Sequence, residues 1–257
     1  MRKIAVVLFV TVLSNVTVAS ILAQERTIGV VVGNWFRYSV DFRWNSTDPD
    51  AVFPPVGKEY LAEVNETEWI LLSIQNVYSP LVDLHMVKHL RNGTERVDVG
   101  HVDIATGLGN MSCSVISANL SVNDLVYTHA EFSGWRINET VTRDYENSSR
   151  ETNHLNITID YSSLFGHTFY DVIEYYWDRA TGAMVECTRK EVNQTELYLT
   201  TWSETQEIIE SNVWVVPEMP NAASVLLALF TLTVTATICQ KRFAKHRSDS
   251  LLPDRKS

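Results

Sequence analysis

The stretch WFRYSVDFRW, residues 35–44, decides the fold class of this chain. Its even-numbered positions are all apolar, and its odd-numbered positions after Trp35 are all polar. Side chains of a β-strand point alternately to the two faces of a sheet. This period of two therefore predicts a strand with one buried face.

Similar segments recur along residues 24–216, separated by turn residues such as Asn92-Gly93. No stretch in this region holds a convincing helical period. Several strands at short spacing predict an all-β domain, built as an antiparallel sheet, a sandwich or an open barrel. The further strands are expected at Trp69–Gln75, Val82–Leu90, Trp135–Arg143, Glu151–Asp160, Tyr170–Trp177, Met184–Glu191 and Tyr198–Ile209.

Two short segments, residues 103–107 and 178–182, share the pattern Asp-x-Ala-Thr-Gly. Similar hairpin turns explain this pattern, because glycine readily supplies the positive φ that such turns need. The alternative is an internal duplication.

The N-terminal residues 1–23 have the composition of a secretory signal peptide. Arg2 and Lys3 precede a long apolar run that ends in small residues. This order is typical of a signal that is cleaved on export, here after Ala23. The alternative is an uncleaved membrane anchor, since the run is long enough to span a bilayer.

The C-terminal residues 222–239 are apolar except for Ser and Thr. Eighteen helical residues span about 27 Å, close to the hydrocarbon core of about 30 Å, so we expect one transmembrane helix. The tail 240–257 begins with a basic cluster that includes Lys241 and Arg242. Basic flanks stay in the cytoplasm, which places residues 24–216 outside the cell.

The expected external domain is strongly acidic. Residues 24–216 hold 28 Asp or Glu and 13 Lys or Arg. This excess of negative charge repels phosphate backbones and argues against nucleic acid as a partner.

Residues 217–221 precede the expected membrane helix and contain the motif Pro217, Glu218, Met219 and Pro220. A short Pro-Glu-Phe-type motif, an apolar helix and a basic cluster form the sorting tail of archaeal surface proteins, which this end resembles, with Met219 in place of the usual Phe. The resemblance implies a cell-surface protein and an archaeosortase-like enzyme as a partner.

The middle of the chain resembles a group of uncharacterised archaeal secreted proteins. The matching features are a Gly-x-Trp-x-x-Tyr opening strand at residues 33–38 and a Tyr-Trp-Asp-x-x-Thr-Gly hairpin at residues 176–182. This resemblance implies export and a β fold, and it implies no activity.

Asn-x-Ser/Thr sequons are the densest pattern in the chain. Ten occur, one of them within residues 1–23, against roughly three expected from the composition. Such sequons are glycan acceptors on the surface of exported proteins. The nine sequons beyond the signal peptide lie at Asn45, Asn65, Asn92, Asn110, Asn119, Asn138, Asn147, Asn156 and Asn193.

Three cysteines are present, and Cys239 falls in the expected membrane helix. Cys113 and Cys187 remain as a pair in an oxidising compartment, and we expect a disulfide between them. It would stabilise the fold by about 4 kcal/mol through the long loop that it closes. The alternative is two separate buried thiols.

No established catalytic motif is found, so we expect neither catalysis nor a cofactor. His85, His89 and Asp83 share one face of a strand, which is a weak metal pattern. Six tryptophans in expected strands either fill the core or line a binding concavity. They are Trp35, Trp44, Trp69, Trp135, Trp177 and Trp202.

The favoured function is therefore a structural or interaction role in the cell envelope, with other envelope proteins as partners. The first alternative is an extracellular module that holds an apolar or carbohydrate ligand in a curved sheet. The second alternative is an extracellular hydrolase, because two acids suffice for glycoside hydrolysis.

Overall fold

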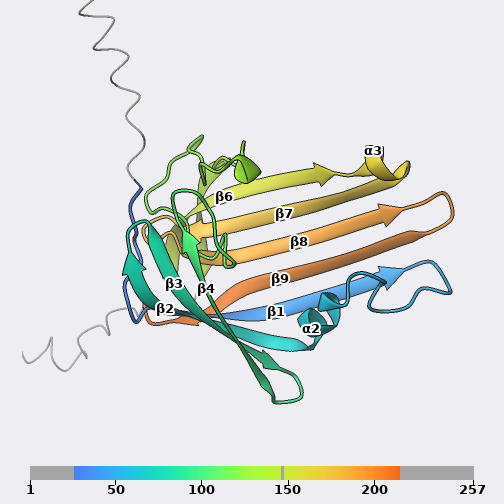
Figure 1. Ribbon diagram of the computed structural model, residues 1–257, viewed down its shortest axis with the longest axis horizontal. Helices are drawn as coiled ribbons and strands as arrows, with labels where there is room; N and C mark the ends of the chain where they lie inside the picture. The colour runs from blue at the N-terminus through green and yellow to red at the C-terminus, as the bar shows by residue number, and fades with distance from the viewer. Residues whose placement is uncertain (1–25, 146–147, 215–257) are drawn as a thin grey trace, which may run out of the picture. The chain divides into compact units, whose positions relative to one another are not determined.

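The computed structural model describes residues 26–145 and 148–214. Over these residues the chain forms a single nine-stranded antiparallel sheet in the order β4-β3-β2-β1-β9-β8-β7-β6-β5 (Figure 1). The sheet is open, with β4 and β5 at its edges, so the prediction of an all-β antiparallel fold is confirmed. The strands are β1 (Trp35–Ser46), β2 (Thr67–Tyr78), β3 (Leu81–Leu90), β4 (Glu95–Asp103), β5 (Glu139–Tyr145), β6 (Ser148–Asp160), β7 (Thr168–Asp178), β8 (Met184–Gln194) and β9 (Leu199–Ser211).

Two meanders make up the sheet. Strands β1 to β4 follow one another as neighbours, and so do strands β5 to β9. The last strand, β9, then pairs with the first, β1, from Phe36 opposite Ser211 to Ser46 opposite Thr200. This pairing of distant segments joins the two meanders into one sheet.

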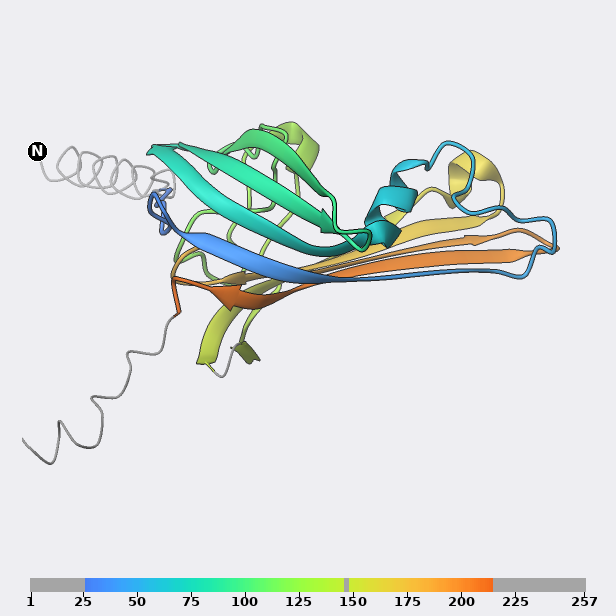
Figure 2. The ribbon, with the colours of Figure 1, turned by 90° about the horizontal axis from the view of Figure 1, so that it is seen from below.

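The inner face of the sheet is the face to which Phe36 and Tyr38 point, and both side chains are buried. The connection between β4 and β5, residues 104–138, lies over part of this face (Figure 2). Its apolar side chains fill the space against the sheet, and removal of apolar surface from water stabilises this arrangement. The buried members are Ile104, Met111, Val115, Ile116, Leu120, Val126, Tyr127 and Ile137.

Polar bonds fix this covering segment to the sheet and also brace it internally. The indole nitrogen of Trp177, on β7, donates a hydrogen bond to the backbone oxygen of Cys113 at 2.7 Å. The Tyr127 hydroxyl donates to the Val115 oxygen at 3.1 Å and accepts from the Cys113 nitrogen at 2.9 Å. These bonds satisfy polar groups that burial removes from water.

The two Asp-x-Ala-Thr-Gly segments form turns of the same kind, as predicted. Gly107 and Gly182 have φ of +84° and +73°. Each glycine donates its backbone N–H to the oxygen of the aspartate that begins its segment, at 2.7 Å. A Cβ on Gly182 would lie 2.1 Å from the Ile116 oxygen, so this turn also needs glycine for close approach.

Sequence patterns did not predict strand β4 or the helices. Most side chains of β4, an edge strand, are exposed. A strand without a buried face has no alternation of apolar and polar residues by which its sequence could be identified. The helices are short and interrupt loops. They are α2 (Tyr60–Glu66), α3 (Ser162–Phe165) and the 3-10 helix η1 (Ala130–Phe132).

The expected signal peptide, residues 1–23, and the expected tail, residues 217–257, lie outside the described residues. Among the helices that the structure describes, none has the length and apolar character to cross a membrane. The membrane helix at residues 222–239 therefore stays a prediction.

Candidate functional site

The two ends of the sheet present different groups. At the chain-exit end the chain enters β1 and leaves β9, and the Trp35 nitrogen donates to the Asn212 side chain at 2.8 Å. At the opposite, far end three loops meet, residues 47–59, 161–167 and 195–198, because they connect neighbouring strands. The exposed apolar side chains of these loops are Val52, Val56, Leu164, Phe165, Leu197 and Tyr198.

Lys58 reaches the inner face at this far end. Its ammonium forms an ion pair with Glu191, whose side chain is nearly buried. The same ammonium lies 5.4 Å from the ring centroid of Phe169 and 5.9 Å from that of Trp202. A cation at such distances from aromatic faces is attracted by their quadrupoles. Strands β7, β8 and β9 thus supply one carboxylate and two rings around one ammonium.

A second ion pair lies beside the first. Arg189 donates to Asp171 Oδ2 at 2.6 Å, and the Arg189 guanidinium lies 5.1 Å from the Trp202 ring centroid. Asp171 is 2% exposed, and its other carboxylate oxygen has no hydrogen-bond partner. Burial alone would lower the pKa of Arg189, but the hydrogen bond and charge of Asp171 reverse this, and its pKa is raised.

The pKa of the Tyr60 hydroxyl, at the start of α2, responds to the charges of the same region. Burial raises the pKa of Tyr60, and the carboxylates of Glu191, Asp171 and Glu204 raise it further, while Arg189 opposes them. The charges of these three carboxylates therefore act on this hydroxyl. We call the group of Lys58, Tyr60, Asp171, Arg189, Glu191 and Glu204, with the rings of Phe169 and Trp202, the far-end cluster.

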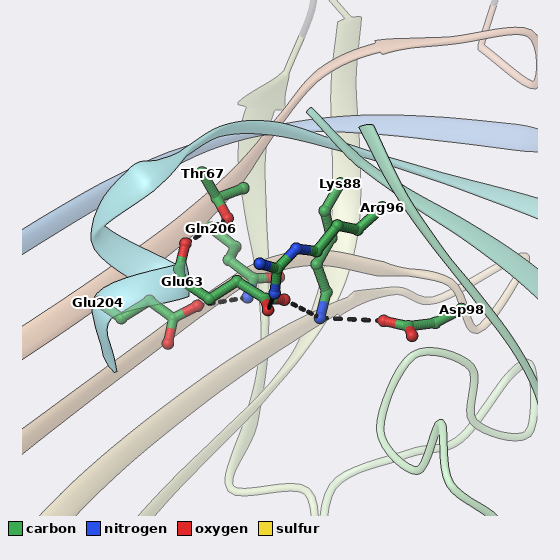
Figure 3. Close-up of polar contacts among 7 residues, drawn as sticks. All are labelled: Glu63, Thr67, Lys88, Arg96, Asp98, Glu204 and Gln206. Atoms are coloured by element: carbon green, nitrogen blue, oxygen red, sulfur yellow. Dashed lines mark hydrogen bonds and ion pairs between the residues drawn. The ribbon is translucent and has the colours of Figure 1, made fainter. Parts of the chain in front are cut away.

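A neighbouring network holds α2 against the sheet (Figure 3). Glu63 on α2 binds Lys88 at 2.9 Å and also Arg96, and Lys88 binds Asp98 at 3.0 Å. The Thr67 hydroxyl donates to the Glu63 backbone oxygen at 2.8 Å. A seven-residue helix is not stable alone, so these contacts with β3 and β4 position it.

The outer face carries an open apolar groove near the chain-exit end, with a volume of about 480 Å³. Trp35, Trp69 and Leu71 line it. Its polar rim is Arg37, which lies 4.3 Å from the Trp69 ring centroid and pairs with Glu210 at 3.5 Å. Half-exposed aromatic and charged groups of this kind suit contact with another surface.

The tryptophans thus serve both of the uses that the sequence left open. Trp177 and Trp202 are buried against the inner face, whereas Trp35 and Trp69 line the outer groove. Trp44 and Trp135 are half-buried.

On the outer face, His89 and Asp83 of the weak metal pattern contact neighbouring side chains instead of each other. The His89 ring stacks on Trp69 with centroids 4.6 Å apart, and Asp83 accepts from the Asn76 amide at 3.3 Å. Within residues 26–145 and 148–214, no three His, Cys, Asp or Glu side chains form a group that could hold a metal ion.

The structure brings Cys113 and Cys187 to the same place. Both thiols are free, and each lies close enough to the Tyr175 side chain to be affected by it. Burial raises the pKa of the Cys113 thiol to about 12 and raises that of Cys187 as well. The disulfide between these residues stays a prediction.

Asn92 is the sequon with the most favourable geometry. It occupies the turn between β3 and β4, is exposed, and accepts from the Thr94 nitrogen and hydroxyl at 2.9 and 2.7 Å. The oxygen makes both bonds, so the turn does not require the nitrogen to which a glycan is attached.

Two sequons use the amide nitrogen in the fold. Asn110 donates from this nitrogen to the Val99 oxygen at 3.1 Å and accepts from the His101 nitrogen at 3.1 Å. Asn156, exposed on β6 as expected for an acceptor in a strand, donates to Glu174 at 3.0 Å.

The remaining sequons differ in their exposure. Asn45, Asn119 and Asn138 are exposed, and Asn65 and Asn193 are half-buried. Asn147 and the motif Pro217, Glu218, Met219 and Pro220 lie outside the described residues.

Sequence reasoning did not find the far-end cluster, although one signal was present. Asp171, Arg189 and Glu191 occupy odd-numbered positions, as do the apolar inward residues Ile173 and Trp177. A charged residue that alternates in step with the inward-facing residues of its own strand also points inward. Such a residue indicates a site or an ion-pair network.

No family model matches this chain. No curated protein matches it either. The function is therefore argued from the geometry described above.

We predict that Glu63→Gln destabilises the domain by about 1.5–3 kcal/mol at pH 7, the range for hydrogen bonds to charged groups. Hydrogen bonding from Lys88 lowers the pKa of Glu63, with further contributions from the charges of Lys88 and Arg96. A carboxylate with a lowered folded pKa stabilises the fold above its unfolded pKa of about 4.3 and loses this effect as the pH falls through the folded pKa.

Urea unfolding at pH 7 and at progressively lower pH tests this prediction. The difference between wild type and Glu63→Gln is expected to shrink as the pH falls below about 4. Glu68→Gln, which alters a more exposed acid next to α2, is the control. A difference that stays constant with pH would contradict the ionic role of Glu63.

We predict that Asn92 carries glycan in the native host and that Asn110 does not. Asn92→Gln should remove the mass of one glycan from the intact protein, whereas Asn110→Gln should leave the glycan mass unchanged. Mass spectrometry before and after deglycosylation measures both. Wild-type protein whose mass does not change on deglycosylation would contradict the prediction for Asn92.

Proposed function

We propose that this chain is a membrane-anchored, N-glycosylated cell-surface protein whose β domain binds other components of the envelope without catalysis. Support from the sequence comes from the signal peptide, the sequons, and the basic tail that follows residues 222–239. The binding role rests on the composition of the far end of the sheet. Three loops there expose apolar side chains beside a charged cluster, and such patches on exported domains are typical of interaction sites.

The position of these loops also supports this role. The chain leaves the sheet at Ser211, at the chain-exit end of β9. The far-end loops lie at the opposite end of the same strands, beyond Ser46 of β1 and before Leu199 of β9. An interaction surface placed there stands away from the point at which the chain leaves for the expected membrane helix.

The alternatives have weaker support. A ligand held inside the sheet needs an enclosed apolar cavity. Apolar residues of segment 104–138 instead fill the part of the inner face that they cover, and the large apolar groove is open on the outer face. For glycoside hydrolysis two acids must flank the scissile bond, whereas Glu191 and Asp171 are each engaged in an ion pair with a cation.

The topology is tested with protease added to intact cells that express the chain with an epitope after Arg247. We expect digestion of the β domain and protection of the epitope, because basic residues hold the tail inside. Protection of the β domain with loss of the epitope would overturn the proposed orientation. Mature protein that keeps its β domain but lacks the epitope would indicate processing within residues 217–220.

The interaction role is tested by native electrophoresis of detergent-solubilised envelopes. Wild type should migrate in a complex larger than the monomer. The double variant Val56→Asp and Leu197→Asp should shift the protein to monomer mass, because charged groups at both loop tips cannot be buried in a contact without cost. Leu108→Asp changes an exposed apolar residue of another loop and is the matched control. Wild type at monomer mass would contradict the proposal.

A further inference from the structure

The ammonium of Lys58 occupies a site whose composition is that of a receptor for organic cations. Glu191 supplies a carboxylate from β8, and Phe169 and Trp202 supply ring faces from β7 and β9. Glu191 and Trp202 are cross-strand partners, so the sheet fixes their relative position. Carboxylates and aromatic faces together recognise primary and quaternary ammonium groups.

The far-end cluster holds more negative than positive charge even with Lys58 in place. Glu191 pairs with Lys58 and Asp171 with Arg189, and Glu204, the cross-strand partner of Arg189, adds a third carboxylate. The cluster contains buried atoms without a hydrogen-bond partner, namely the acceptor Oδ1 of Asp171 and the donors Nε of Arg189 and Nε1 of Trp202. A buried carboxylate oxygen without a partner is costly, so the site is poised to accept a further donor.

Lys58 belongs to a loop and not to the sheet that forms the site. In the preceding residue, Gly57, φ is +80°, and Val56 before it is fully exposed. This loop also contacts the sheet through the ring of Phe53, whose centroid lies 5.7 Å from that of Phe42 and 5.5 Å from that of Trp44, and through Thr47, whose backbone nitrogen donates to the Leu199 oxygen at 2.9 Å. Lys58 is thus the part of the site that comes from outside the sheet, whereas Glu191 and the rings of Phe169 and Trp202 belong to strands β7 to β9.

We propose that the far-end cluster is a binding site for an alkylammonium group from outside the chain, and that Lys58 fills this site when no ligand is bound. This inference rests on the proposed interaction role and specifies its chemistry. The ammonium belongs either to a small molecule such as choline or to a lysine side chain of an envelope partner. Glu191 and the two rings hold the cation, and the free oxygen of Asp171 accepts one more hydrogen bond.

The test removes the internal cation and supplies an external one. Full-length Lys58→Ala is purified in detergent, and its melting temperature is measured with and without n-butylammonium chloride. Loss of the ion pair should lower the melting temperature by at least about 2 °C. Butylammonium, which matches the missing side chain, should restore most of this loss and should raise the melting temperature of wild type less, because there it must displace Lys58.

Four controls separate charge recognition from other effects. n-Butanol fills the same space without charge and should not restore the melting temperature. Lys58→Arg keeps a cation in the site and should not respond to butylammonium. Lys190→Ala, which removes an exposed lysine of β8, should not respond either. Adding Glu191→Gln to Lys58→Ala should abolish the rescue.

The source of the ammonium is distinguished by comparing choline with Nα-acetyl-lysine amide on Lys58→Ala. At least tenfold tighter binding of one probe assigns the site to small quaternary amines or to lysine side chains. Failure of every ammonium probe to raise the melting temperature of folded Lys58→Ala would overturn the site, as would equal rescue by butanol. Rescue in a protein that is not membrane-anchored would keep the site and reject the proposed location.

Discussion

The pairing of β1 with β9 is the interaction on which the rest of the structure depends. It joins segments that are more than 150 residues apart and turns two meanders into one sheet. Contacts between such distant segments have a large entropic cost, and they become favourable only when long strands pair along their whole length. The inner faces of the two halves then form one surface. Lys58 from the first half meets Glu191 from the second only because this pairing exists.

Local patterns predicted the elements that bury one face. The alternation in residues 35–44 predicted both β1 and the side that it buries, because Phe36, Tyr38 and Val40 lie in the core. The pattern failed at β4, whose exposed side chains leave no period. It also failed for α2, which is too short to show one and is held by the ion pairs of Glu63.

The far-end cluster shows why a site is harder to predict than a strand. Its polar residues come from a loop, from α2 and from strands β7 to β9, and each has an ordinary local sequence. Their meeting depends on register, which places Glu191 opposite Trp202 and Asp171 opposite Glu191. Spacing in the sequence carries little of this information. The nearness of Cys113 and Cys187 was expected only from the number of cysteines and from the compartment. In the structure Cys113 lies in the covering segment, Cys187 lies on β8, and the Tyr175 side chain of β7 is close to both.

The amide of Asn110 has a consequence for how the sheet ends. The backbone groups of Val99 and His101 on β4 face the free edge, and this one side chain satisfies both in the manner of a further strand. Gly100 leaves the room for it, because a Cβ there would lie 2.1 Å from the Asn110 oxygen. An unsatisfied edge recruits strands from other molecules. A sugar on the same nitrogen would leave it a single N–H and place a bulky group at this edge, so modification of Asn110 would disturb the side chain that finishes the sheet.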